Sequence, residues 1–266
     1  MCRMKTTTLI LNLVLLAELA FAVTQPTLRY DLSGEMQLRM EQEIFVGSRS
    51  EAIASREFWM TFDMVGAEDN EDLLVKLASI RGNYTAHGMN QRLPTSHLTG
   101  SEFRLLGDGR SFRSQEGGGE VPLGAIIDGG LRPSELLAGL LPALPDGPVS
   151  VGTTWIAERS ILSLEGWAWA GGNMQYHHEV TDIQQSNGRT VIHVKTHGET
   201  AIEAAAGHDG FLGLGTLARS MDWTFDADSG QLLSLSIEQE ASGTNQLPQG
   251  EIAIRQIVRY DLQTGN

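Results

Sequence analysis

Histidines form the only concentrated group of potentially reactive side chains in this sequence. Asn187-Gly188 is a strong signal for a two-residue β-hairpin turn. Such a turn would place His178 opposite His197 on the neighbouring strand. It would also place Asp182 opposite His193 on the same face of the hairpin. Imidazole and carboxylate groups are common zinc ligands, so the pattern first suggests a metal site.

The distance between the two pairs argues against one site with four ligands. They lie four residues apart along the strand, which is about 13 Å at about 3.3 Å per residue. Ligands of one ion must converge, because each metal–ligand bond is about 2 Å long. Only His178 and His197, with Glu199 one step along the same face, could then share an ion. We expect no metal, and interpret the histidines as partly exposed strand residues with an ordinary surface ion pair between Asp182 and His193.

Other motifs that carry chemistry do not fit their surroundings. Residues Gly213 to Ala218 have the glycine spacing of a dinucleotide-binding loop, but the crossover helix that such a loop requires does not follow. Asp226 begins a stretch similar to a calcium loop, yet its twelfth position is Ile237 instead of glutamate. The Gly-x-Ser-x-Gly, Ser-x-x-Lys and His-Glu-x-x-His patterns are missing from the sequence. We therefore predict a protein without enzyme activity and without a cofactor.

Alternating apolar and polar residues predict the long strands that must position any site. Residues 36–46 place their apolar side chains on one face, with Gln42 and Phe45 as exceptions. Residues 58–64 repeat this pattern, and residues 73–80 predict a third strand. The last strand, over residues 252–262, is interrupted by Gln256.

Turn signals predict how several strands pair. Asp108-Gly109 favours a two-residue turn that would place Leu105 opposite Phe112. Near residue 230, a three-residue loop with Gly230 in the left-handed conformation would pair Trp223 with Leu235 and Phe225 with Leu233. We prefer this loop to a two-residue one, because it brings apolar side chains together across the strands.

A methionine-rich apolar face could form a cavity for variable apolar ligands, because thioether side chains are flexible. The alternative is that these side chains fill a closed core, which is the more common use of such residues. Trp155, Trp167 and Trp169 could line the mouth of a cavity, although tryptophans in strands usually serve packing. The candidate cavity residues are Met36, Leu38, Met40, Phe58, Met60, Phe62, Met64, Leu137, Leu141 and Trp155.

One short helix is predicted near residues 133–141. Pro133 is favourable in the first helical turn, Glu135 lies beside it, and Pro142 ends the leucine-rich run. A helix of this length is marginal alone, so it must pack against the sheet.

The segment after this helix carries a family resemblance. Its pattern Pro-x-x-Pro-Val-x-Val-Gly-x-x-Trp, from Pro145 to Trp155, followed by alternating strands, resembles an element of uncharacterised secreted bacterial β-rich proteins. Their organisation is similar to the periplasmic lipoprotein-carrier fold, an incomplete antiparallel barrel with helices against its opening. The resemblance implies no enzyme activity and no particular functional residue.

The N-terminal residues predict export. Arg3 and Lys5 precede an apolar run, and residues 20–22, Ala-Phe-Ala, fit a signal-peptide cleavage site after Ala22. The apolar run is too short to be a membrane anchor. Cleavage would leave residues 23–266 with a net charge of −15 instead of −14, and without cysteine. So acidic a chain is a poor partner for nucleic acid, which binds concentrated basic patches.

Together these patterns predict a mainly β protein, a curved antiparallel sheet or incomplete β-barrel with a short covering helix near residues 133–141. We expect one secreted domain over 23–266; the alternative is two lobes, 23–116 and 151–266, joined by 117–150. The predicted role is a periplasmic or extracellular binding module for a lipid or other apolar small molecule, with no transmembrane segment after signal cleavage. The alternatives are a structural protein with a filled core that engages an envelope protein, and a metal-dependent enzyme using the histidines.

Overall fold

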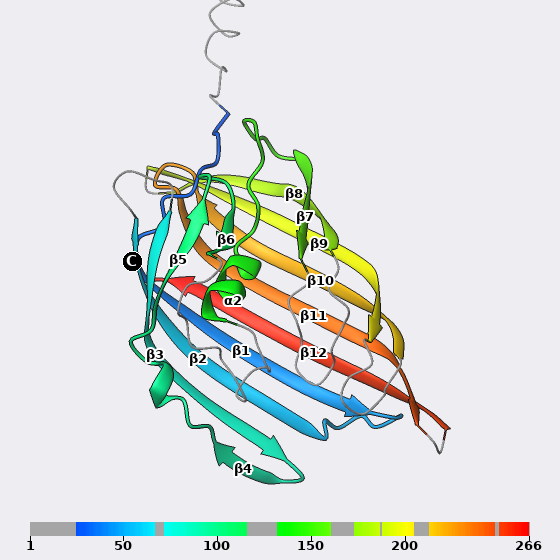
Figure 1. Cartoon of the computed structure of the whole chain (residues 1–266). Coiled ribbons are helices and arrows are strands. Elements are labelled where there is room, and N and C mark those ends of the chain that lie inside the picture. Colours follow the sequence, from blue (N-terminus) through cyan, green and yellow to red (C-terminus); the bar gives the residue numbers. More distant parts are fainter. Residues whose placement is uncertain are drawn as a thin grey trace, which may run out of the picture.

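The computed structural model describes residues 25–66, 72–115, 132–160, 173–186, 188–204, 213–247 and 250–265. Within these ranges the chain forms one twelve-stranded antiparallel sheet that does not close into a barrel. The one α-helix found among the described residues lies over the sheet (Figure 1). The predicted fold class is therefore confirmed. The predicted cleavage site after Ala22, together with Trp167 and Trp169, lies outside the described residues.

The helices and strands are numbered as in Figure 1. The helices are α2 (Pro133–Leu140) and the 3-10 helix η1 (Ser96–Leu98). The strands are β1 (Gly34–Val46), β2 (Ala54–Gly66), β3 (Leu73–Ala86), β4 (Met89–Arg92), β5 (Glu102–Gly107), β6 (Phe112–Ser114), β7 (Thr154–Ser160), β8 (Asn173–Ser186), β9 (Arg189–Ala204), β10 (Gly213–Asp226), β11 (Gln231–Leu247) and β12 (Gly250–Thr264).

The first and last strands meet in the middle of the sheet. The strand order is β6-β5-β3-β2-β1-β12-β11-β10-β9-β8-β7, and β4 pairs with β3 as a branch. In the central pair, Leu38 faces Leu262 and Met40 faces Tyr260. Strands from before and after residues 117–150 therefore belong to the same sheet. Among the described strands, this path ends at β6 on one side and at β7 on the other.

Period-two alternation gives the sheet one buried face and one polar face. On β1 the residues Met36, Leu38 and Met40 are buried, whereas the intervening residues 37 and 39 are exposed. Side chains at alternate positions of a strand point to opposite faces, so the buried residues of all the long strands collect on one side. We call this side the inner face, and the opposite side the outer face. The inner face and α2 share one hydrophobic core.

Helix α2 begins and ends where the prolines predict. Pro133 occupies the first turn, and the backbone N–H of Arg132 donates a hydrogen bond of 2.9 Å to the Glu135 carboxylate. The last helical hydrogen bond runs from Leu141 N to Leu137 O. Pro142 has no N–H to continue the helix. Burial of Leu136, Leu137 and Leu140 then supplies the packing that so short a helix requires.

Two of the predicted pairings are wrong by a small shift. Leu105 pairs with Ser114, not with Phe112, because residues 108–111 form a longer loop in which the Asp108 side chain accepts hydrogen bonds from Arg110 N and Ser111 N. Near Gly230, the predicted pairing of Trp223 with Leu235 is confirmed. Phe225, however, pairs with Leu232 instead of Leu233, because the register of β10 shifts after Thr224.

Candidate ligand-binding site

The metal site considered from the sequence is not formed, because the hairpin of β8 and β9 contains a bulge. Asp182 faces His193 as predicted, but the register shifts between Val180 and Asp182. His178 therefore pairs with Thr196, and His177 pairs with His197. A one-residue slip moves a side chain to the opposite face. His178 is consequently buried, whereas His197 and Glu199 are exposed on the outer face.

The predicted ion pair between Asp182 and His193 is also replaced. The Asp182 carboxylate accepts hydrogen bonds from Ile183 N at 2.9 Å and from Gln184 Nε2 at 2.7 Å. Across the described residues, no three histidine, cysteine, aspartate or glutamate side chains gather closely enough to hold a metal ion.

His178 instead belongs to an aromatic cluster on the inner face. Its ring stacks on Trp155 with centroids 4.8 Å apart, and its Nδ1 lies 2.7 Å from Thr196 Oγ1. Trp223 Nε1 donates to the same hydroxyl at 3.0 Å. Burial, with smaller contributions from the charges of Arg159 and His177, lowers the pKa of His178 to about 3. The imidazole is therefore neutral at physiological pH.

The ten candidate cavity residues all belong to the inner-face core or pack against it. Cross-strand neighbours include Met36 with Phe62, and Met40 with Phe58. Seven of the ten come from β1 and β2, and each of these is at most 2% exposed. The two leucines of α2 and its C-cap are fully buried against the same cluster, and Trp155 is partly buried at its margin. The ten are Met36, Leu38, Met40, Phe58, Met60, Phe62, Met64, Leu137, Leu141 and Trp155.

Residues 133–149, which we call the lid, cross the inner face. Beyond α2, two aromatic side chains bind the carbonyl groups of the lid. Tyr30 Oη donates to Pro142 O at 2.7 Å, and Trp155 Nε1 donates to Ala143 O at 2.9 Å. Burial raises the pKa of the Tyr30 phenol far above its usual value, so it remains a donor. The lid is thus tied to the sheet by hydrogen bonds as well as by leucines.

Two arginines bind the C-terminal end of α2. Arg159 Nη1 donates to Ala138 O at 2.9 Å, and Arg219 Nη1 donates to Gly139 O at 3.3 Å. Cations at this end of a helix interact favourably with its dipole. Sequence reasoning missed both residues. The signal was available, because each occupies an inward position of an otherwise apolar alternation, Arg159 after Trp155 and Arg219 between Leu217 and Met221.

Three buried glutamines, also missed, extend this polar group along the inner face. In the sheet, Val258 lies between Gln42 on β1 and Gln239 on β11. Gln256 is two residues from Val258 on β12 and therefore diagonal to both. Gln42 and Gln256 were visible in the sequence as interruptions of apolar faces. Only the pairing of β1 with β12 shows that the interruptions lie side by side.

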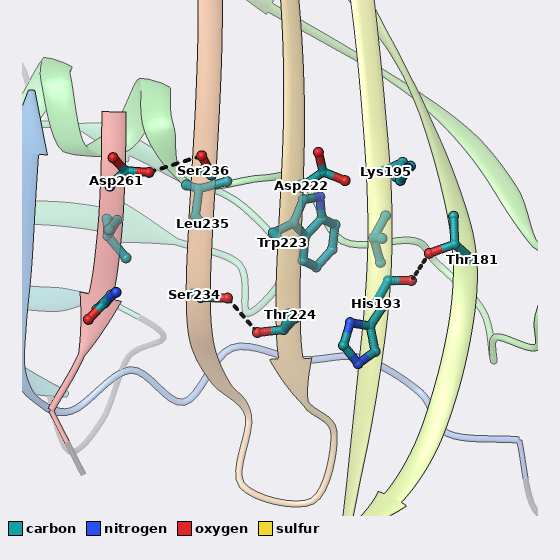
Figure 2. A pocket seen from close by; sticks show the side chains of 13 residues that line it. Thr181, His193, Lys195, Asp222, Trp223, Thr224, Ser234, Leu235, Ser236 and Asp261 are labelled. Atoms are coloured by element: carbon teal, nitrogen blue, oxygen red, sulfur yellow. Dashed lines mark hydrogen bonds between the residues drawn. The ribbon is translucent and has the colours of Figure 1, made fainter. Parts of the chain in front are cut away.

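The outer face carries polar depressions. One of about 340 Å³ crosses β8 to β12, and Figure 2 shows its side chains. Ser236 Oγ donates to Asp261 at 2.9 Å, and the hydroxyls of Thr224 and Ser234 are 2.7 Å apart. A second depression of about 630 Å³ lies towards β7 and includes His177 and His197. The hydrogen bonds in the first depression join polar side chains on neighbouring strands, as is usual on a solvated face.

Comparisons with known proteins give no match to this chain, either among protein-family models or among curated proteins. Among the residues that the structure describes, no helix has the length and apolar character needed to span a bilayer.

Proposed function

We propose that this protein is an exported, non-enzymatic binding module that holds an apolar or amphipathic ligand between the inner face of its sheet and its lid. The observation that carries the proposal is the methionine and phenylalanine surface of β1 and β2, which shares one apolar cluster with the leucines of the lid. The export is inferred from the N-terminal sequence.

Methionine makes this surface adaptable. Met36, Met40, Met60 and Met64 are all at most 2% exposed, and they alternate with rigid phenylalanines across β1 and β2. An unbranched thioether has several accessible rotamers and a polarisable sulfur, so it can repack around chains of different shape. In a core that only needed to be filled, branched side chains would specify a single packed arrangement better than methionine does.

The lid supports the proposal because hydrogen bonds to its main-chain carbonyls hold it to the sheet in addition to its buried leucines. Donors on Tyr30, Trp155, Arg159 and Arg219 each bind one lid carbonyl. Each such bond contributes a net stability of only about 1 kcal/mol, or somewhat more for the charged donors. A ligand that offers apolar contacts can therefore compensate for a displaced lid.

Native mass spectrometry of the protein purified from its source cells without detergent tests the proposal. We expect a mass above that of the polypeptide, and release of a lipid-sized molecule into organic solvent. A reproducibly empty protein that co-purifies with an envelope protein would instead support a structural role with a filled core.

A further inference from the structure

The strongest unexplained feature of the molecule is a pair of inner-face arginines, one buried and one partly buried, that form no ion pair with a carboxylate in the part of the chain that the structure describes. Arg219 is 2% exposed, and its Nε and Nη2 have no hydrogen-bond partner. The Nη2 of Arg159 is also buried and unpartnered. Among the ion pairs of the described residues, none involves either arginine. A buried charge is expensive unless it is paired, so this arrangement requires an explanation.

The two guanidinium groups lie close together. They bind consecutive carbonyls of α2, those of Ala138 and Gly139. Burial lowers the pKa of Arg159 and the positive charge of Arg219 adds to this effect, whereas Tyr30, Tyr176 and the Asp108 carboxylate oppose it. The carbonyl oxygens and the Tyr176 hydroxyl, 3.2 Å from Arg219 Nη1, supply only partial negative charge. The pair therefore keeps a net charge of about +2, because arginine remains protonated in proteins.

Neighbouring residues complete a set of hydrogen-bond donors. Gln239 is the direct cross-strand partner of Arg219, is 1% exposed, and has an unpartnered Nε2. On the other side, Arg219 pairs with Gly198. A Cβ atom at Gly198 would lie 2.9 Å from Tyr176 Cδ1, so glycine gives Tyr176 the room to lie beside Arg219. Four buried donor atoms thus lack partners: Arg159 Nη2, Arg219 Nε, Arg219 Nη2 and Gln239 Nε2.

From this geometry we infer an anion subsite, formed by Arg159, Arg219 and Gln239, that binds the carboxylate or phosphate group of an amphipathic ligand. The inference rests on the proposed binding function and names the ligand class. Guanidinium groups match carboxylate and phosphate oxygens through paired N–H donors. The acyl part of the ligand would extend from this subsite along the methionine face of β1 and β2, past the buried amides of Gln42 and Gln256.

A matched pair of fluorescent probes tests the subsite. cis-Parinaric acid and its methyl ester have the same chain, and at pH 8 only the acid carries a charge. We expect the wild-type protein to bind the acid at least about tenfold more tightly than the ester, the amount that one charge-assisted hydrogen bond supplies. In Arg219→Met the ratio of acid affinity to ester affinity should fall to about one, whatever the change in ester affinity that follows from losing the bond to Gly139 O. Arg113→Met, at an exposed position of β6, is the control and should keep the preference.

The outcomes separate the subsite from the wider proposal. Equal binding of acid and ester by the wild type would overturn the subsite and leave apolar binding intact. Failure of both probes to bind would overturn both ideas. Displacement of the acid by oleate, by dioleoyl phosphatidate or by inorganic phosphate identifies the source of the anion, and displacement by none of them would contradict the subsite.

The melting temperature of Arg219→Met shows whether the substitution disturbs the fold. In ligand-free Arg219→Met the relief of an unpaired buried charge offsets the loss of the hydrogen bonds to Gly139 and Tyr176, so the melting temperature should change little. A large fall would show that Arg219 serves the fold through Gly139 and Tyr176, and would contradict an anion-binding role.

Discussion

At the scale of single residues, burial determines the chemistry of the inner face. His178 was a candidate metal ligand, yet its ring stacks on Trp155 and its pKa is lowered to about 3. Its environment is apolar and lies near a positive charge, so the neutral ring is favoured. Arg159 and Arg219 place two guanidinium groups beneath the lid, where they bind the carbonyls of Ala138 and Gly139.

The lowered pKa of His178 predicts acid sensitivity. The unfolded chain binds a proton below pH 6.5, whereas the folded protein does not until about pH 3, so stability falls as the pH drops through this window. The loss is about 1.4 kcal/mol per pH unit, or about 2 kcal/mol between pH 6.5 and 5. Urea unfolding at pH 7.5 and pH 5 measures it. In His178→Phe the difference in unfolding free energy between the two pH values should shrink by about 2 kcal/mol. In the control His197→Gln it should stay as in the wild type. The same pH difference in both variants would contradict a role for His178 in acid sensitivity.

Gly198 provides a second prediction at this scale. An added Cβ would lie 2.9 Å from both Gln175 O and Tyr176 Cδ1. Gly198→Ala should therefore destabilise the protein by about 1–3 kcal/mol, as overpacked sites do. Thermal unfolding compares it with Gly147→Ala, where no atom lies within 4 Å of the added group. Equal melting temperatures for the two variants would be inconsistent with the close packing around Tyr176.

At the scale of elements, the strands and the helix could be predicted from the sequence, but several registers could not. Alternation over residues 36–46 and the prolines flanking residues 134–141 report local preferences, which a sequence displays directly. The bulge at Thr181 and the shift after Thr224 have no such signal, because an inserted residue is stabilised by contacts with distant strands. One bulge was sufficient to move His178 to the opposite face from His197.

The packing of the lid on the sheet can be tested at Leu137. Leu137 is fully buried between α2 and the sheet. Leu137→Glu should reduce the free energy of unfolding by a few kcal/mol and loosen any bound ligand, because it places a charge in an apolar core. Leu74→Glu is the matched control, since Leu74 on β3 is 44% exposed. An unchanged melting temperature and ligand content in Leu137→Glu would show that the lid is only a linker between β6 and β7.

At the scale of the whole molecule, the pairing of β1 with β12 organises the site. It places strands from the two ends of the chain at the centre of the sheet, where Gln42, Gln239 and Gln256 meet. The candidate apolar residues could be found from the sequence because they alternate within single strands. Arg159 and Arg219 could each have been noticed as a charge within an apolar alternation, but their grouping with Gln239 could not be predicted, because it is assembled from β7, β10 and β11 by long-range pairing.

The inner face and the lid are together proposed to hold one apolar chain. Titration of the purified, delipidated protein with the methyl ester of cis-parinaric acid measures this most directly, because the fluorescence of the probe rises in an apolar environment. We expect saturation at one probe per protein, with an affinity that is weakened by Leu137→Glu and unaffected by Leu74→Glu. An absence of saturable binding to the folded wild-type protein would contradict the account.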